Sequence, residues 1–261
     1  MNMRPHVDAP ARPVGPLYLP EAEFHAIARI VHQDFGLHLP IGKKDLVVSR
    51  LTRRVKDLGL TDFAGYVRLL DSPAGHEEVR ALRSMLTTNV TRFFREDHQF
   101  AVLRARVLPP LLERARAGGR VRLWSAGCSA GQEPYSLALT LLDMCPNVAD
   151  LDVLILATDI DPRVLDHARE GIYPAEEAEA IPPAMHRHLA DAADLAPGFV
   201  AMGTGARRLV RFAELNLMGD WPMRGALDVI LCRNVVIYFT AEDQVALWQR
   251  FARALPKDGY L

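Results

Sequence analysis

The 261-residue sequence predicts an α/β fold that follows a small all-helical domain. Two patterns lead to this prediction. Between residues 21 and 86, apolar residues recur at helical spacing, and clusters of Gly, Pro and Asp interrupt them. From residue 121 onward, short apolar runs alternate with helical patterns. That order of elements builds a parallel sheet with right-handed crossovers.

The elements follow one another in a clear order. Residues 1–20 are proline-rich and predict a disordered leader. The helical domain covers residues 21–86, and residues 87–120 form a linker and a connecting helix. The α/β domain then spans residues 121–261. Its expected elements are strands near 121, at 153–159, 209–212 and 227–232, and helices at 133–144, 162–169 and 241–255.

Composition and charge exclude several classes of protein. The chain is 49% hydrophobic and 24% charged, which fits a soluble protein with one or two domains. Its net charge of −1 provides no overall field toward nucleic acid or membrane. No apolar run approaches membrane-spanning length, and the N-terminus lacks the apolar core of a signal peptide. We therefore expect a cytoplasmic protein without membrane insertion.

The cysteines and histidines do not have metal-site spacing. Cys128, Cys145 and Cys232 form no C-x-x-C pair, and the nine histidines include no H-E-x-x-H pattern. We expect reduced thiols and no metal.

The most informative stretch is VRLWSAGCSAGQEPYS, at residues 121–136. An apolar strand ends there in a turn that contains Gly127, and Glu133 then opens a helix. The next apolar strand ends in two carboxylates, Asp159 and Asp161. In a doubly wound sheet, such glycines let the backbone approach a nucleoside-bearing cofactor. The acid at the end of the second strand accepts hydrogen bonds from ribose hydroxyls.

The details of the turn indicate which cofactor is bound. The glycine spacing is G-x-x-x-G rather than G-x-G-x-x-G, and no G-K-[ST] follows. An acidic Glu133 at the start of a helix would also repel a phosphate. A cationic cofactor with an amino-acid end fits better, and S-adenosylmethionine is the obvious candidate.

Two alternatives apply to the same turn. Residues 127–131 also match G-x-S-x-G, the nucleophile elbow of α/β-hydrolases. Such an enzyme needs a later histidine, but none follows the apolar run at 227–232. A tight turn without a ligand is the simpler alternative, but it does not explain the two acids at the end of the second strand.

The helix expected at residues 43–58 has a basic face opposite its apolar face. A solvated surface with a few ion pairs would account for it. The functional alternative is a docking surface for an acidic protein helix, formed by Arg50, Arg53, Arg54 and Lys56. Nucleic acid is a poorer partner, because no aromatic residues interleave with the basic ones.

Two further segments combine polar and aromatic residues. TTNVTRFFRE lies at residues 87–96, and CRNVVIYF at residues 232–239 follows the last predicted strand. A helix cap with an aromatic pair would explain the first, and a strand end whose Asn caps a turn would explain the second. Ligands of open α/β sheets bind beyond the carboxyl ends of strands, where Asn234 and Tyr238 should project.

Together, TTNVTRFFRE, GCSAGQEPYS, ATDID, FAELNLM, CRNVVIYF and the basic helix KKDLVVSRLTRRVKDLGL resemble the CheR family of chemotaxis-receptor glutamate O-methyltransferases. The resemblance covers residues 21–261. It implies a Rossmann-like class I S-adenosylmethionine methyltransferase domain with a small inserted β-subdomain at about 172–212, which in some members grips a tethering peptide of the receptor. The substrate would be glutamate side chains on the cytoplasmic helical domain of methyl-accepting receptors, and S-adenosylhomocysteine the product. We expect a monomer recruited to receptor arrays.

The resemblance also implies roles for individual residues. Glu133 should face the methionine end of the cofactor and Asp159 its ribose. The remaining cofactor contacts should come from Asn89, Thr91, Arg95, Gly127, Asn216, Leu217, Asn234 and Val235. Arg95, Tyr238 and Arg92 are the candidate catalytic residues. A glutamate side chain, with a pKa of about 4.3, is already ionised at neutral pH, so the reaction requires no general base.

Two departures from the family pattern bear on these expectations. Gln132 replaces the first of two acids at the turn, which removes one negative charge. The chain ends at Leu261, where the family's fifth strand begins, so about three C-terminal strands are expected to be missing, and the strand at 227–232 should be an exposed apolar edge. A non-catalytic domain that binds S-adenosylmethionine or a signalling helix, and a methyltransferase for another acceptor, remain alternatives.

Overall fold

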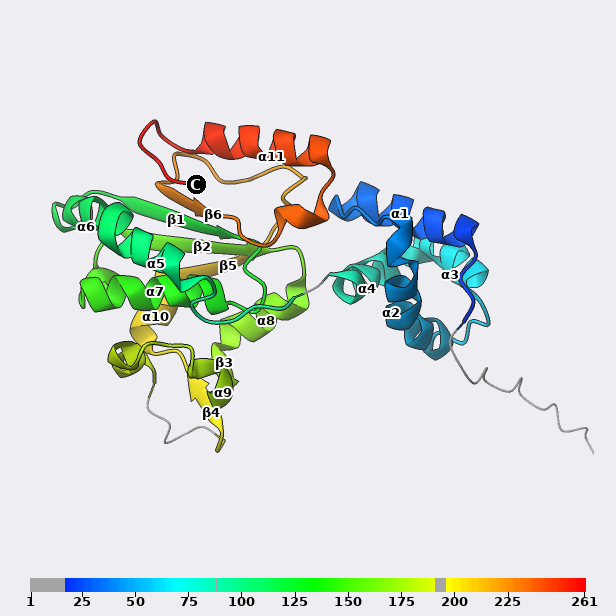
Figure 1. Ribbon diagram of the computed structural model, residues 1–261, viewed down its shortest axis with the longest axis horizontal. Helices are drawn as coiled ribbons and strands as arrows, with labels where there is room; N and C mark the ends of the chain where they lie inside the picture. Colours follow the sequence, from blue (N-terminus) through cyan, green and yellow to red (C-terminus); the bar gives the residue numbers. More distant parts are fainter. Residues whose placement is uncertain (1–16, 88, 191–195) are drawn as a thin grey trace, which may run out of the picture. The chain divides into compact units, whose positions relative to one another are not determined.

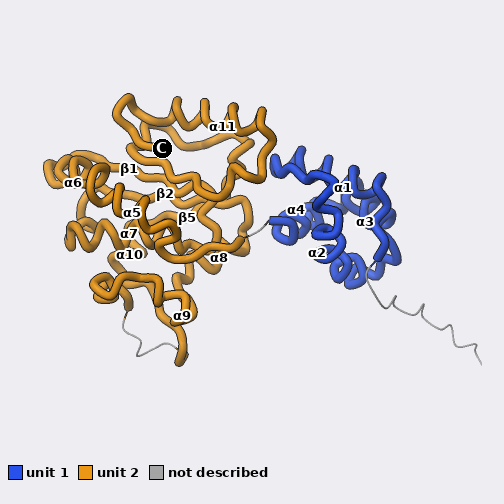
Figure 2. The backbone as a smooth tube through the Cα atoms, in the orientation of Figure 1, with its two compact units in different colours: residues 1–87 blue, residues 88–261 orange. Residues whose placement is uncertain are grey.

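The computed structural model describes residues 17–87, 89–190 and 196–261, and these form two compact units, residues 1–87 and 88–261 (Figure 2). Most of the predicted leader lies outside the described residues. Its last part does not behave as a leader, because Leu19 is only 1% exposed. No helix in the described ranges is long and apolar enough to cross a membrane.

The described part of the first unit contains four α-helices: α1 (Glu21–Phe35), α2 (Lys44–Asp57), α3 (Phe63–Leu70) and α4 (His76–Leu86). The apolar spacing of the sequence becomes its core, which includes Phe24, Ile27, Val31, Val47, Leu51, Val55, Phe63 and Leu82. The Asp62 side chain accepts a hydrogen bond from Gly65 N (2.7 Å) and thereby caps α3.

A buried polar cluster ties α2, α3 and α4 together. Glu78 is only 5% exposed, and both of its carboxylate oxygens accept hydrogen bonds from Arg54, at 2.6 to 3.1 Å. The hydroxyl of fully buried Tyr66 donates to the same carboxylate (2.8 Å). The charge is therefore paired within the domain, as a buried carboxylate requires.

The second unit is built on a four-stranded parallel sheet in the order β5-β2-β1-β6 (Figure 1). The strands are β1 (Val121–Ala126), β2 (Val153–Asp159), β5 (Val210–Glu214) and β6 (Val229–Leu231). β2 and β5 lie on one side of β1, and β6 lies on its other side, so the strand order reverses at β1. Ligands of such sheets bind where the strand order reverses, beyond the carboxyl ends of β1 and β6.

Helices cover both faces of this sheet (Figure 1). The larger apolar cluster lies under α5 (Asp97–Val102), α6 (Leu108–Arg116), α7 (Gln132–Met144), α8 (Pro162–Glu170) and α10 (Thr204–Leu209). A π-helical turn at Leu103–Val107 joins α5 to α6. The smaller cluster contains Trp124, Leu247 and Phe251, with Trp221 packed against it, and lies under α11 (Ala241–Ala254). Helices on both faces of a parallel sheet make the predicted doubly wound fold.

A small antiparallel pair lies apart from the main sheet. Strands β3 (Ile172–Pro174) and β4 (Phe199–Ala201) pair with each other, and α9 (Ala175–Ala178) follows β3. The predicted subdomain, 172–212, is therefore too long at its C-terminal end. β5 pairs in parallel with β2 and belongs to the main sheet. Alternation of residues identifies a strand but not the strand with which it pairs.

The outer edge of β6 is not open, contrary to the sequence-based expectation. Tyr260 forms a parallel bridge with Val229, donates its N–H to Asp228 O (3.0 Å) and accepts from Ile230 N (2.9 Å). Val229 and Ile230 are 1% and 0% exposed. The last residues of the chain thus cover the apolar strand.

Candidate functional site

The turn after β1 brings the backbone close to two other segments. The N–H groups of Gly127 and Cys128 both donate to Thr158 O, at 2.8 and 2.9 Å. Gly127 has φ +82°, and a Cβ atom there would lie 2.3 Å from Val235 Cγ2. Only glycine fits both this backbone conformation and this space.

Asp159 ends β2 beside this turn and is 8% exposed. Its carboxylate accepts from Ser129 N (2.7 Å) and from Asp161 N (3.0 Å). Burial raises the pKa of Asp159, while these backbone N–H groups oppose the rise. The carboxylate still has a lone pair for a further donor such as a ribose hydroxyl.

The segment before α5 is fastened to the same turn. Ser129 Oγ donates to Asn89 O (3.0 Å), and Asn89 Nδ2 donates to Asp161 Oδ2 (3.1 Å). Asp161 also caps α8 by accepting from Arg163 N (3.0 Å). The structure therefore brings Asn89 to within two hydrogen bonds of Asp159, and Thr91 follows it, partly exposed.

Glu133 lies in the first turn of α7, and its side chain is 14% exposed. Ser125 Oγ on β1 donates to Oε1 (2.7 Å), and Arg233 Nη1 donates to Oε2 (3.1 Å). Burial raises the pKa of Glu133, and these two contacts oppose the rise. A carboxylate held in this way can accept a further donor on each oxygen.

Arg233 lies in the candidate site, although the sequence interpretation did not select it. Besides Glu133, its guanidinium contacts Glu96 Oε2 (3.3 Å), donates to Arg95 O and lies over the Phe100 ring (5.6 Å). The next residue, Asn234, has φ +59° and donates to Glu96 Oε1 (3.5 Å). Arg233 lies in the segment CRNVVIYF, which the sequence analysis singled out. Its role could not be inferred there, because the residues that it contacts are remote in sequence.

The candidate catalytic residues differ in exposure. The Arg95 side chain is half-buried and donates to Val90 O (3.1 Å), and Arg233 links its backbone to Glu133. Tyr238 is half-buried in a short 3-10 helix, Val236–Tyr238, three residues after Val235, which approaches Gly127. Arg92 is exposed.

Asn216 and Leu217 follow β5, beyond the carboxyl end of the sheet. Leu215 N donates to Asp159 O (2.9 Å), which places this loop next to the end of β2. Asn216 Oδ1 accepts from Met218 N (2.9 Å). Leu217 O accepts from Trp221 Nε1 (3.1 Å) and from Arg250 (2.6 Å). Both residues are thus fixed near the end of β2.

Gln132 does not face the carboxylates of this site. Its amide donates to Glu177 Oε2 (2.9 Å) in α9, and it is 3% exposed. An acid at position 132 would meet Glu177 as a like charge, so glutamine suits this neighbour.

The basic face of α2 is only partly available to a partner. Arg50 donates to Leu86 O (2.8 Å) and Thr87 O (2.9 Å) at the end of α4, and Arg54 pairs with Glu78. These two side chains hold the domain together, which the prediction of a docking role did not foresee. Arg53 is 92% exposed, with Asp57 at 3.7 Å, and Lys56 is half-buried.

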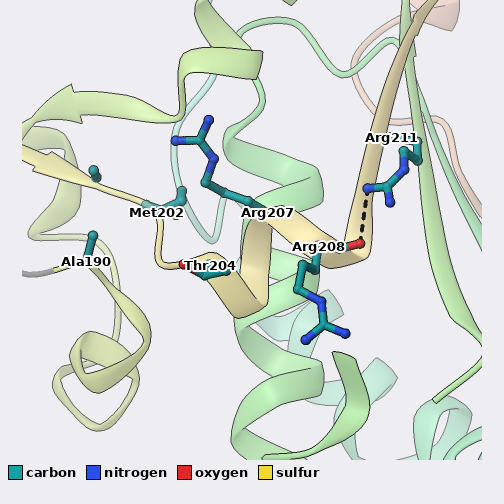
Figure 3. A pocket seen from close by; sticks show the side chains of 7 residues that line it. Ala190, Met202, Thr204, Arg207, Arg208 and Arg211 are labelled. Carbon is teal, nitrogen blue, oxygen red and sulfur yellow. Dashed lines mark hydrogen bonds between the residues drawn. The ribbon is translucent and has the colours of Figure 1, made fainter. Parts of the chain in front are cut away.

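A separate cavity of about 410 Å³ lies beside α10 and contains none of the predicted site residues (Figure 3). Arg207, Arg208 and Arg211 line it, but their side chains point in different directions (Figure 3). Arg207 donates to Glu170 O and Arg169 O at the end of α8, and Arg208 pairs with Asp150 (3.0 Å). The three charges do not converge on one ligand position.

The site fits a cofactor with a cationic amino-acid end and a ribose. Two carboxylates, Glu133 and Asp159, lie near the ends of neighbouring strands, and glycine at 127 allows Val235 to approach the turn between them closely. Among the described residues, no group of three or more His, Cys, Asp and Glu side chains could hold a metal ion.

The comparisons with known proteins identify the family. Residues 89–261 match the S-adenosylmethionine-binding domain of CheR methyltransferases, and residues 22–87 match the all-alpha domain of the same enzymes. The chain belongs to the CheR methyltransferase family. The family resemblance, the fold class and the S-adenosylmethionine cofactor predicted from the sequence are confirmed.

Similar proteins extend over most of this CheR-family chain. A probable chemotaxis protein methyltransferase of Rhizobium etli is 50% identical over 233 residues, which are 89% of this chain and 87% of the relative. The chemotaxis protein methyltransferase of Escherichia coli K12 is 40% identical over 94% of this chain and 84% of its own. That of Salmonella typhimurium is 38% identical, with 94% and 83% covered. The chain is thus a chemotaxis protein methyltransferase, the class of enzyme that the sequence predicted.

Proposed function

We propose that this methyltransferase esterifies glutamate side chains on the cytoplasmic helical domain of chemotaxis receptors. The observation that carries the proposal is the pair of carboxylates, Glu133 and Asp159, fixed near the carboxyl ends of β1 and β2 in a chain of this family. The enzyme acts in the cytoplasm, as a monomer recruited to receptor arrays. When bound, S-adenosylmethionine supplies an electrophilic methyl group on a sulfonium.

The chain's own residues orient the two reactants. Glu133 accepts from the ammonium group of the cofactor's methionine end, and Asp159 from the ribose hydroxyls. Asn216, Leu217, Asn234 and Val235 surround the adenosyl part, while Asn89 and Thr91 line the pocket from the segment before α5. The accepting carboxylate is ionised at neutral pH, so no base is needed. Orientation and exclusion of water supply most of the acceleration, and holding reactants in place is worth about 7–11 kcal/mol.

Receptor docking belongs to the part of α2 that remains accessible. Arg53 projects from the domain, and Lys56 lies on the same helix. A basic helix face complements an acidic receptor helix and increases the rate of encounter more than the strength of the complex. Arg50 and Arg54 support this face by anchoring α2 to α4.

The decisive experiment follows labelled methyl from S-adenosylmethionine into receptor-containing membranes. We expect the label in the receptor band as an ester that releases methanol in alkali. Receptors whose modified glutamates are changed to alanine should stay unlabelled. A base-stable label would indicate another acceptor, and no label despite binding of S-adenosylhomocysteine would indicate a non-catalytic domain.

Arg95→Ala is expected to lower the affinity for S-adenosylhomocysteine about tenfold, because a hydrogen bond from a charged donor to the cofactor's carboxylate contributes about 1.5–3 kcal/mol. Titration calorimetry measures this change. Arg92→Ala is the matched control: it should leave this affinity unchanged and raise the KM for the receptor. Equal affinity of the Arg95 variant and the unaltered enzyme would rule out the proposed contact.

Tyr238→Phe is expected to lower kcat about tenfold and to leave S-adenosylhomocysteine binding intact. The ring would still flank the methyl path, but its hydroxyl could no longer orient the reactants, and the loss of one hydrogen bond is worth about 0.5–1.5 kcal/mol. Single-turnover methyl transfer measures the effect. Tyr18→Phe, the same change at a residue 78% exposed in the helical domain, serves as the control. Full activity of the Tyr238 variant would exclude a role for the hydroxyl.

A further inference from the structure

We propose that Arg233 is a positioning residue for the cofactor's amino-acid end, which it serves by fixing the Glu133 carboxylate. The proposal rests on the proposed function, because it takes Glu133 as the acceptor for the cofactor's ammonium group. It adds a residue that neither the family resemblance nor the sequence patterns assign. Arg233 contacts Glu133 and is not itself proposed to contact the cofactor.

The geometry places the Arg233 guanidinium between three segments of the methyltransferase unit. Nη1 donates to Glu133 at the start of α7, and Nη2 lies by Glu96 and the Arg95 carbonyl just before α5. The guanidinium carbon lies over the Phe100 ring, 5.6 Å from its centroid. The side chain is 10% exposed, so these contacts have little competition from water.

The contacts of Arg233 fix the orientation of the Glu133 carboxylate. Arg233 and Ser125 each occupy one lone pair of the Glu133 carboxylate, so the remaining lone pairs have fixed directions.

Arg233 also favours the charged form of Glu133. The titratable groups around Glu133 are Arg233 and Cys232 after β6, Glu96 before α5, and Cys128 after β1. Burial raises the pKa of both thiols, that of Cys232 to about 12, so they are neutral at physiological pH. Glu96 disfavours a charge on Glu133, whereas Arg233, the cation in this group, lowers the pKa of Glu133 and so favours its charged form.

The test compares two ligands that differ only at the amino-acid end. S-adenosylhomocysteine carries the ammonium group, and 5′-methylthioadenosine lacks it. Arg233→Met should weaken the binding of S-adenosylhomocysteine about tenfold or more and leave the binding of 5′-methylthioadenosine within about twofold, since only the first ligand presents an ammonium group to Glu133. Arg122→Met, which removes an arginine paired with Asp152 at the other end of β1, should change neither affinity.

Four outcomes separate this inference from the proposed function. If Arg233→Met weakens both ligands equally, Arg233 is merely structural and the inference is overturned. If Glu133→Gln weakens S-adenosylhomocysteine but Arg233→Met does not, the inference fails and the role of Glu133 stands. If Glu133→Gln has no effect on binding, the proposed role of Glu133 is wrong, and the inference about Arg233 is wrong with it. Non-additive losses in the double variant would support direct coupling of the two residues.

The pH dependence of binding provides a second test, because a purely structural role of Arg233 would not change it. Binding needs ionised Glu133, and loss of Arg233 raises the pKa of this carboxyl further. In Arg233→Met the affinity for S-adenosylhomocysteine should therefore fall on acidification from a higher pH than in the unaltered protein. Arg233→Lys, which retains a cation, should restore much of the original profile. Parallel profiles for all three proteins would contradict the inference.

Discussion

Replacing Glu78 by alanine is expected to destabilise the helical domain by about 3 kcal/mol. The substitution removes the partner of Arg54 and leaves the fully buried Tyr66 hydroxyl without its acceptor. Arg54 is 39% exposed and can regain water, so the penalty arises mainly at Tyr66 and from the space left behind. Hydrogen exchange of amides in α2, α3 and α4 reports the free energy of opening for this domain alone.

The neighbouring residue supplies a matched control. Glu77 precedes Glu78 in the first turn of α4, its side chain is 87% exposed, and its ion pair with Arg80 spans 3.8 Å. Glu77→Ala should change stability by less than about 0.5 kcal/mol, as surface pairs do. Equal protection of amides in the two variants would show that the buried cluster contributes nothing to the domain.

Gly127→Ala is expected to weaken S-adenosylhomocysteine binding by about tenfold to a hundredfold. The new Cβ would lie 2.3 Å from Val235 Cγ2, so the turn or the segment after β6 must move, and overpacking of this kind costs about 1–3 kcal/mol. Both segments are proposed to contact the cofactor, and a shift in either disturbs it. Calorimetric titration and thermal unfolding measure binding and stability separately.

Gly118→Ala distinguishes the steric effect from backbone strain. Gly118 has φ +83°, nearly the value of Gly127, but a Cβ there would meet nothing within 4 Å. Its substitution should cost about 1–2 kcal/mol of stability from the left-handed backbone and leave cofactor affinity unchanged. Equal losses of affinity in the two variants would mean that close approach to Val235 plays no part in binding.

The sequence predicted the positions of those candidate site residues that follow from a strand end. Asp159 ends an apolar run and Glu133 begins the helix after another, and parallel strands bring such positions to one edge of the sheet. Arg233 could not be found in this way, although it lies in a quoted segment. Its partners, Glu133 and Glu96, come from other segments, and no local pattern encodes the pairing of a long side chain.

The same limit explains the differences in the helical domain and in the insertion. The amphipathic pattern of α2 correctly separated its polar face from its apolar face, but it could not show that α4 covers part of the polar face. The sequence therefore placed Arg50 and Arg54 on the surface available to a partner. β5 was found as a strand, but its pairing with β2 depends on contacts that a single strand does not reveal.

The three tryptophans give the chain an internal optical label. Trp124, Trp221 and Trp248 all belong to the methyltransferase unit, and the helical unit has none. Trp124 and Trp221 meet edge to face, with ring centroids 4.8 Å apart, and Trp221 donates to the carbonyl of Leu217. Tryptophan fluorescence, excited selectively, will thus report the unfolding of the methyltransferase unit alone. Comparing it with far-ultraviolet circular dichroism, which reports both units, will time their unfolding separately in a single unlabelled sample.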